Sequence, residues 1–321
     1  MTPHGHGDTA ERQGPVTTTA PPARRPGRGM AVASAVLSAA CWGSATVMSK
    51  GVLEYMPPLT LLTIQLTASI AFLWIAVLVL RRPVRLDRPA RRASLSGLLE
   101  PGIAYTLGVA GLALTTASSA SLIGTAEPLF VMLLAWLFLR ERVSAPVVGL
   151  LSMASLGIGL VVLPDIGDGA GEGSLLGDGL IAAGTLFAAL YVIATRKLVM
   201  AFDPLPLSAL QQSVGLIWTL GSLALALSLG LATVGLGGVG LDILCLAAVS
   251  GVVQYALAFW LYLFALRRLP ANIAAFYLAL IPVFGIGTAY VFLGEGLTEL
   301  QWLGAILIIV AVGAISRLSR E

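Results

Sequence analysis

Two carboxylates lie within long apolar stretches of the sequence, and each of them directly precedes a proline. Glu127 precedes Pro128 in GTAEPLFVMLL, and Glu100 precedes Pro101 in GLLEPGIAYTL. Proline has no backbone N–H, so it breaks or bends a helix and leaves a carbonyl group unpaired. A carboxylate at such a break can exchange a proton or bind the ammonium group of a solute. An ionisable residue inside an apolar span is therefore a functional-site hypothesis.

Each carboxylate also has a purely structural interpretation. The Glu127 carboxyl group can be held by a hydrogen bond to a neighbouring helix without binding anything else. Glu100 can cap a helix or extend toward water. The functional interpretation is favoured for Glu127, which lies about eight residues into its apolar run, roughly 12 Å at ~1.5 Å per residue.

Neutral polar and aromatic side chains occur in the same apolar runs. They can hydrogen-bond a polar solute, but they can equally join two helices or lie at a membrane interface. The candidate binding residues are Trp42, Gln65, Tyr105, Tyr191, Gln254 and Tyr277, and similar side chains are Gln211, Gln212, Tyr255 and Trp260. As a set they predict a moderately polar cavity with aromatic walls, which suits a zwitterion or small organic solute better than an inorganic ion.

Motifs of other chemistries are missing from the sequence. It has no Gly-x-x-x-x-Gly-Lys-Ser/Thr nucleotide loop, no Gly-x-Ser-x-Gly elbow and no His–Glu metal cluster. Cys41 and Cys245 both fall in apolar runs, which argues against a disulfide framework or a zinc site. We therefore expect no catalytic residue, no metal and no cofactor.

The composition indicates a membrane protein. Hydrophobic residues make up 57% and charged residues 11% of the chain, and the mean hydropathy is +0.92, whereas soluble domains carry about 25% charge. Ten apolar runs are long enough to cross a core of about 30 Å as helices. They lie at 30–52, 59–80, 93–115, 120–139, 146–163, 178–195, 206–229, 241–264, 271–293 and 300–316. The predicted fold is an all-α integral membrane protein with ten transmembrane helices.

The basic residues predict an orientation. If residues 1–29 form a disordered cytoplasmic tail and the ten spans alternate, eighteen of the 19 Lys and Arg residues lie in the cytoplasm. Lys50 is the exception, and we interpret it as an ion-pair partner of Glu54. This places both termini in the cytoplasm. It also accounts for the net charge of +3 without a nucleic-acid partner.

The chain contains an internal repeat. Residues 97–142 align without a gap on residues 251–296, 154 positions later, and Pro128–Glu141 falls on Pro282–Glu295. Chance similarity between two Ala- and Leu-rich stretches is the alternative, but the kept Pro-to-Glu spacing argues against it. At the polar positions, Glu100 falls on Gln254, and Glu127 falls on an isoleucine.

Each half holds five predicted spans, so the second copy is inverted in the membrane. The first repeat covers 30–163 and the second covers 176–316. Inverted repeats related by an axis in the membrane plane are a transporter architecture. We expect helix breaks at Pro128 and Pro282 to face each other near the midplane.

Short motifs follow one another in a fixed order through both halves. They are Trp42-Gly43-Ser44 with Lys50, Ser118-Ser119-Ala120-Ser121, Glu127-Pro128-Leu129-Phe130, Leu139-Arg140-Glu141-Arg142, Gly177-Asp178-Gly179, Arg196-Lys197, Arg267-Arg268, Pro282-Val283-Phe284 and Gly294-Glu295. In this order and spacing, residues 30–316 resemble the EamA branch of the drug/metabolite transporter superfamily.

The resemblance implies an inner-membrane (plasma-membrane) permease that exports amino acids or other small metabolites. It also implies a central cavity lined by helices 1, 3, 4, 6, 8 and 9. Its expected partners are a small-molecule solute, the lipid bilayer and a coupled proton, and a homodimer is left open. Two positions depart from the family pattern, since Gln65 stands where Arg is frequent and Ile281 where Glu is frequent.

Other functions remain open alternatives. An importer or a drug-efflux permease would have the same fold. An intramembrane enzyme acting on a lipid-linked substrate would need clustered carboxylates at a cytoplasmic helix end, where Glu100 is expected to stand alone. A sensor or structural subunit would carry a signalling domain, which the sequence lacks.

Overall fold

The computed structural model describes residues 27–112, 114, 123–124, 126–141, 144–162, 175–293 and 298–318. The tail predicted for residues 1–29 lies outside the described residues as far as residue 26. The loop expected after the fifth apolar run, at 164–174, lies outside them as well, and so do the serine-rich motif at 118–121 and Glu295.

The described part of the chain is helical and contains no strand. The elements of the first half are α1 (Arg28–Leu53), α2 (Pro58–Val79), α3 (Arg88–Ser94), η1 (Leu95–Leu98), η2 (Leu99–Ile103), α4 (Ala104–Leu112), α6 (Glu127–Leu134), η3 (Ala135–Leu139) and α7 (Ala145–Val162). Those of the second half are α8 (Leu175–Leu198), α9 (Pro204–Ser228), α10 (Leu241–Gly251), η5 (Val252–Leu257), α11 (Ala258–Leu266), α12 (Ala271–Phe276), η6 (Tyr277–Leu280), α13 (Ile281–Leu293) and α14 (Glu299–Leu318).

Local sequence fixes where several helices begin. Pro58 and Pro204 stand at the first positions of α2 and α9, where the backbone N–H of any residue would lack a helical partner. The Asp203 carboxylate accepts a hydrogen bond from the Leu205 N–H at 3.1 Å and so caps α9. Short connections, residues 54–57 and 199–203, therefore join the first and second helices of the two halves.

Seven helices in the described part of the chain are long and apolar enough to cross a membrane. They are α1, α2, α8, α9, the continuous stretch Leu241–Leu266, the stretch Ala271–Val291, and α14. The all-helical membrane fold is confirmed, but the count of ten spans is not.

The three other predicted spans are not long continuous helices among the described residues. The run at 93–115 is divided among α3, η1, η2 and α4, because the backbone of Glu100 is extended (φ −149°, ψ 129°). The run at 120–139 contains α6 and η3, a shorter apolar helix that begins at Glu127. The run at 146–163 corresponds to α7, which is also among the shorter apolar helices.

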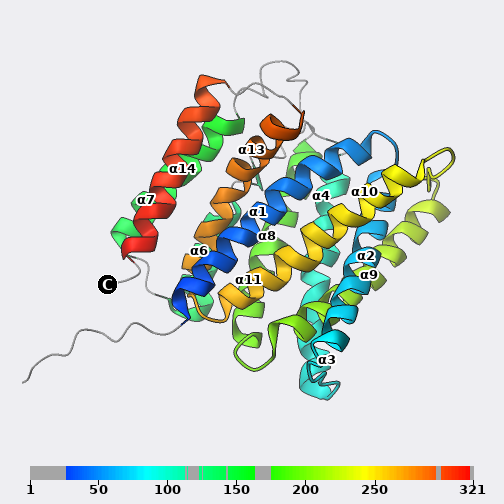
Figure 1. Ribbon diagram of the computed structural model, residues 1–321, viewed down its shortest axis with the longest axis horizontal. Helices are drawn as coiled ribbons and strands as arrows, with labels where there is room; N and C mark the ends of the chain where they lie inside the picture. Colours follow the sequence, from blue (N-terminus) through cyan, green and yellow to red (C-terminus); the bar gives the residue numbers. More distant parts are fainter. Residues whose placement is uncertain are drawn as a thin grey trace, which may run out of the picture.

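The helices pack in pairs drawn from the two halves (Figure 1). α7 lies along α14 at one side of the molecule, and α2 lies against α9 and α10 at the other. Between them, α1 contacts α11 and α13, while α8 contacts α4 and α6. The centre of the molecule is therefore bounded by α1 and α8 together with the broken helices that they contact.

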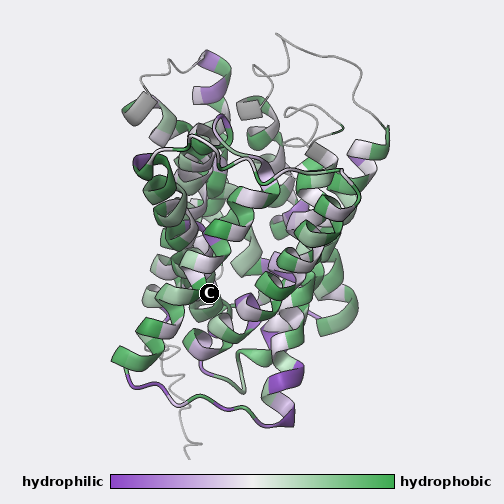
Figure 2. Cartoon of the chain, turned by 90° about the vertical axis from the view of Figure 1, so that its right-hand side faces the viewer, coloured by the Kyte–Doolittle hydropathy of each residue, from purple (hydrophilic) through white to green (hydrophobic). Residues whose placement is uncertain are grey.

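The interior and the outer surface are both apolar. The largest fully buried side chains are aromatic or leucine, and Tyr191, Tyr255 and Tyr262 are among them. Large hydrophobic side chains are also exposed, such as Leu78 (73%) and Ile217 (71%). Figure 2 shows hydrophobic residues along the flanks of the helices and hydrophilic residues gathered mainly toward their ends. A wide exposed apolar surface of this kind is what a lipid-facing protein presents.

Two glycines allow a close approach between helices of the two halves. A Cβ atom at Gly97 would overlap the backbone of Gln211 in α9, and one at Gly251 would overlap the backbone of Gln65 in α2. Gly97 and Gly251 are 154 positions apart, so they are partners in the sequence repeat. Small residues at such contacts let membrane helices pack backbone to backbone.

Candidate functional site

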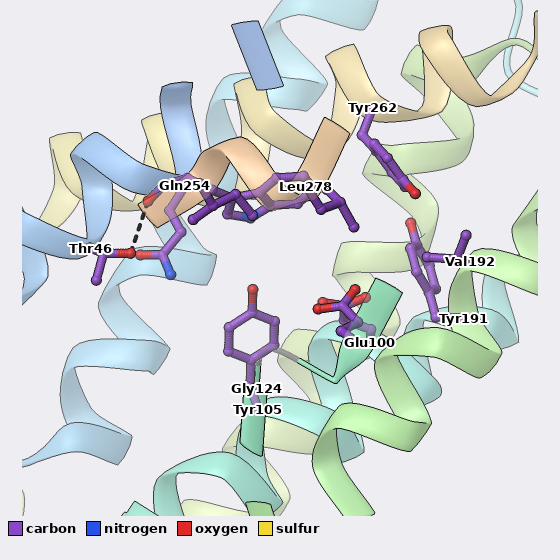
Figure 3. Close-up of a pocket in the computed structure, with 12 residues that line it drawn as sticks. Thr46, Glu100, Tyr105, Gly124, Tyr191, Val192, Gln254, Tyr262 and Leu278 are labelled. Atoms are coloured by element: carbon purple, nitrogen blue, oxygen red, sulfur yellow. Dashed lines mark hydrogen bonds between the residues drawn. The ribbon is translucent and has the colours of Figure 1, made fainter. Parts of the chain in front are cut away.

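A cavity of about 460 Å³ lies at the centre of the molecule, within the size range of small-molecule sites (~300–1,000 Å³). It is lined by Trp42, Thr46, Glu100, Tyr105, Gly124, Glu127, Tyr191, Val192, Gln254, Tyr262, Leu278 and Ile281 (Figure 3). Six of the eight predicted binding residues are in this set. They come from α1, η2, α4, α6, α8 and η5, so both halves of the chain contribute to the cavity.

Both carboxylates identified in the sequence face this cavity. Glu100 lies in η2, where its extended backbone separates two helical pieces, and Glu127 is the first residue of α6. Both residues are half-buried, and they are close enough to interact electrostatically. None of the described lining residues is Lys or Arg. The described lining of the cavity is therefore acidic, and chemically it could accept a proton or a cationic group.

This arrangement corrects one expectation. Glu100 was expected to stand alone, and that isolation was the argument against an intramembrane enzyme. The structure instead places Glu127 in the same cavity, because α6 and η2 both border α8. The argument from isolation is wrong, and the enzyme alternative has to be judged on other grounds.

Aromatic rings form a rigid wall around the carboxylates. The Trp42 ring lies edge-on to Tyr262 and Phe259, with centroids 5.7 Å and 5.1 Å away. Tyr105 makes the same kind of contact with Tyr255 at 5.2 Å. Such edge-to-face pairs hold the rings in fixed orientations.

The hydroxyl group of Tyr262 has no hydrogen-bond partner in the part of the chain that the structure describes. The side chain is only 1% exposed, and its oxygen has no hydrogen bond to any described residue. Buried polar groups are almost always satisfied by protein, water or ligand. Tyr262 was not among the binding residues predicted from the sequence. Only its position on a helix of the second repeat could have identified it as a candidate.

Gln65 and Tyr277 do not reach the cavity. Gln65 is buried between helices, and its Nε2 group donates to the hydroxyls of Ser49 (2.8 Å) and Ser250 (2.9 Å). Tyr277 donates to the Ser316 hydroxyl at 3.2 Å, which joins η6 to α14. Both side chains act as contacts between helices, the alternative that was left open for neutral polar residues.

Pro128 and Pro282 occupy the same position in the two halves. Each is the second residue of an α-helix, α6 or α13, and the 3₁₀ segment η6 directly precedes α13. A missing N–H is tolerated in the first turn. The two prolines therefore stand where regular helix begins, beside the cavity residues Glu127 and Ile281.

A second glutamine repeats the contacts of Gln65 in the other half. Gln211 donates through Nε2 to the hydroxyls of Ser96 (2.7 Å) and Thr195 (3.3 Å), and Ser96 donates in turn to the Ala93 carbonyl (2.7 Å). Among the contacts of Gln65, the Ser250 hydroxyl likewise donates to a backbone carbonyl, that of Ala247.

These contacts are related by the repeat. The two glutamines are 146 positions apart, as are Ser49 and Thr195, while Ser96 and Ser250 are 154 positions apart. Several cavity residues match as well, since Thr46 and Val192 differ by 146 and Gly124 and Leu278 differ by 154. Extending the sequence repeat into the first two helices of each half would have pointed to these residues.

Glu141 serves a different purpose at the end of η3. Its two carboxylate oxygens accept hydrogen bonds from the Ala271 N–H (2.9 Å) and the Asn272 N–H (3.1 Å), and so cap α12. The Arg196 side chain lies 4.0 Å from the same carboxylate and donates to the Leu266 carbonyl at 2.9 Å. This motif residue fastens three helices together away from the cavity.

No group of three or more metal-binding side chains occurs among the residues that the structure covers. The fold and the cavity define a multi-pass membrane protein with two acidic side chains in a central cavity. The model of the EamA-like transporter family matches residues 29–163 and 175–317, and the chain belongs to this family.

Similar proteins agree with this assignment. An uncharacterized transporter from Archaeoglobus fulgidus is 22% identical over 282 residues, which cover 88% of this chain and 96% of that protein. An uncharacterized transporter from Methanothermobacter thermautotrophicus is 28% identical over 221 residues, which cover 68% of this chain and 62% of that protein. A solved crystal structure has a TM-score of 0.74 at 18% identity and covers 89% of this chain and 99% of that one, so the two share a fold.

Proposed function

We propose that the protein is a secondary transporter that exports amino acids or related small metabolites by alternating access. The observation that carries this proposal is the central cavity, where Glu100 and Glu127 lie together among aromatic and amide side chains. The cavity can hold a small solute, and its carboxylates can bind an ammonium group. The family assignment favours transport over catalysis on a lipid-linked substrate.

The proposed architecture has ten spans in two inverted repeats. The segment from α3 to α4, the segment from α6 to η3, and α7 supply the three spans beyond the seven long apolar helices. Helix contacts support the two-fold relation, because α1 packs on α11 and α13 while its counterpart α8 packs on α4 and α6. The pairs α2–α9 and α7–α14 join corresponding helices directly. A relation of this kind allows a central site to open to one side and then to the other.

We further propose that Glu127 couples transport to protons. An ammonium group that enters the cavity favours the charged carboxylate and so displaces its proton. Glu127 has no acidic counterpart in the second half, where Ile281 occupies the matching position. Glu100 is the second carboxylate available for the same exchange.

The proposed location is the inner (plasma) membrane, with both termini in the cytoplasm. Reporter fusions at Gly237, between α9 and α10, should read external, and fusions at Arg88 should read cytoplasmic. The reason is that basic residues crowd the segment before α3 and are absent from the segment before α10. A cytoplasmic signal at Gly237 would contradict the inverted arrangement.

Transport in proteoliposomes tests the function itself. Purified protein in vesicles loaded with unlabelled L-leucine should exchange it for labelled L-leucine, while protein-free vesicles should not. Comparing the metabolites released by cells with and without the protein identifies further solutes and the direction of transport. Absence of exchange for every amino acid tried, together with unchanged metabolite release, would contradict the proposal.

A further inference from the structure

A chain of hydrogen bonds runs from the backbone of α10 to a side chain of the cavity. In each bond, the chemistry of the groups identifies the donor. The Ser250 hydroxyl donates to the Ala247 carbonyl (2.8 Å), so it can only accept from Gln65. The Gln65 Nε2 group therefore faces Ser250, and its second hydrogen goes to the Ser49 oxygen at 2.8 Å. Ser49 keeps its own proton and donates it to Gln254 Oε1 at 3.1 Å.

These donor assignments determine the orientation of the Gln254 side-chain amide. Because Oε1 is the acceptor for Ser49, the Nε2 group must be turned away from Ser49. Gln254 lines the cavity, and Figure 3 shows its amide beside Thr46, with the nitrogen atom on the side of Tyr105. No described residue accepts a hydrogen bond from this nitrogen. A free amide N–H donor is thus presented to the cavity.

We propose that Gln65, although it lies outside the cavity, positions the Gln254 amide through Ser49, so that Gln254 donates to the acceptor end of a bound solute. The two carboxylates then hold the cationic end. This inference rests on the proposed function and specifies it further. The solute class is a small molecule that carries an ammonium group and, at the other end, a carboxylate or carbonyl oxygen.

The matching hydrogen bonds around Gln211 lead to a different cavity residue. Gln211 Oε1 accepts the hydroxyl proton of Tyr191 at 3.1 Å, so this cavity residue has no proton left to donate to a solute. The position that matches Gln254 holds Glu100, which only accepts when it is ionised. At this pair of matched positions, the second half therefore offers an amide donor and the first half a carboxylate acceptor.

A matched pair of probes tests the positioning. L-Leucine and 3-methylbutylamine differ only in the carboxylate, and their binding to purified protein can be measured by calorimetry. We expect wild type to bind L-leucine about tenfold more tightly than the amine, the value of one good hydrogen bond to a charged group. Gln65→Met should abolish this preference while the affinity for 3-methylbutylamine stays within about twofold, since the carboxylates are unchanged.

Gln212→Met is the matched control. Gln212 is a buried residue that also makes two hydrogen bonds, accepting from Ser69 and donating to the Tyr255 carbonyl, but among the described residues it has no hydrogen bond to Gln254 or Ser49. It should keep the preference for L-leucine. An unchanged preference in Gln65→Met, or an equal loss in Gln212→Met, would overturn the positioning role. If Gln65→Met does not fold, Ser49→Ala interrupts the same chain of hydrogen bonds with a smaller change.

A second measurement separates the positioning from the proposed function. In protein with ¹⁵N-labelled glutamine side chains in bilayers, the Gln254 NH₂ signal, assigned by its loss in Gln254→Met, should show contact with cavity water. That contact should be lost or weakened in Gln65→Met. If neither probe binds wild type but this change is seen, the positioning stands and the proposed solute class fails. If the Gln254 signal is the same in both proteins, the positioning is overturned whatever the probes do.

Discussion

The two halves of the molecule build the same frame but place different chemistry in it. A glycine in the third span of each half packs against a glutamine in the second helix of the other half, and that glutamine bonds a serine and a second hydroxyl. At the cavity, however, the first half supplies Glu100 and Glu127, whereas the second supplies Gln254 and Ile281 at the matching positions. Among the lining residues that the structure describes, both charged side chains therefore come from the first half.

This difference separates positions that hold the fold from positions that define the site. The glycine contacts and glutamine networks recur because both halves must pack their helices in the same way. The cavity residues differ between the halves, as the proposed solute with two unlike ends would require. An asymmetric site within a symmetric frame follows from these two requirements.

The largest change in stability is expected from filling the close helix contacts. Gly97→Ala and Gly251→Ala each place a methyl group against a backbone that cannot move aside, and overpacking of this kind costs about 1–3 kcal/mol. Thermal unfolding in detergent should show similar losses in the two halves. Gly287→Ala is the control, because a Cβ atom there has open space around it. A loss at only one of the two glycines would break the equivalence of the halves.

A smaller effect is expected at the two glutamates that close the repeated segment. Glu141→Gln removes the charge that caps α12 and pairs with Arg196. We expect a loss of about 1–1.5 kcal/mol, because a hydrogen bond to a charged group (about 1.5–3 kcal/mol) becomes one to a neutral group (about 0.5–1.5 kcal/mol). If the repeat extends to this contact, Glu295→Gln should lower the melting temperature by a similar amount. A neutral Glu295→Gln variant would limit the correspondence to the helices themselves.

The smallest effect concerns a helix start that the halves do not share. Asp87 caps α3, whereas α10 begins after Gly240 without a side-chain cap. The hydrogen bond from the Ala90 N–H is the main cause that lowers the pKa of Asp87 below its usual value, and the hydrogen bond from Arg85 lowers it further. A lowered pKa in the folded state stabilises the protein above the unfolded value of about 3.9, and this contribution is lost as pH falls through the folded pKa. The melting temperature of wild type should therefore exceed that of Asp87→Asn at pH 6, with a gap that narrows below about pH 4. A gap that does not change with pH would contradict the charged cap.

The sequence predicts the frame better than it predicts the site. Apolar runs and the repeat identify the helical membrane fold, and prolines beside acids identify Glu100 and Glu127. The division of the third run is less predictable, because hydropathy does not register the extended backbone at Glu100. The faces of the helices are also hard to assign, since a helix apolar on all sides gives no sign of which side meets a cavity. Gln65 and the cavity residue Val192 were misplaced or missed for that reason.

The central claim is that the first half's acidic residues make the cavity a proton-coupled transport site. The most direct measurement is L-leucine transport in proteoliposomes by Glu127→Gln, with folding checked and with Ile281→Gln as the matched change in the other half. Transport driven by a pH gradient should be lost in Glu127→Gln while exchange of L-leucine persists, and Ile281→Gln should retain both. Full gradient-driven transport in Glu127→Gln would contradict the claim.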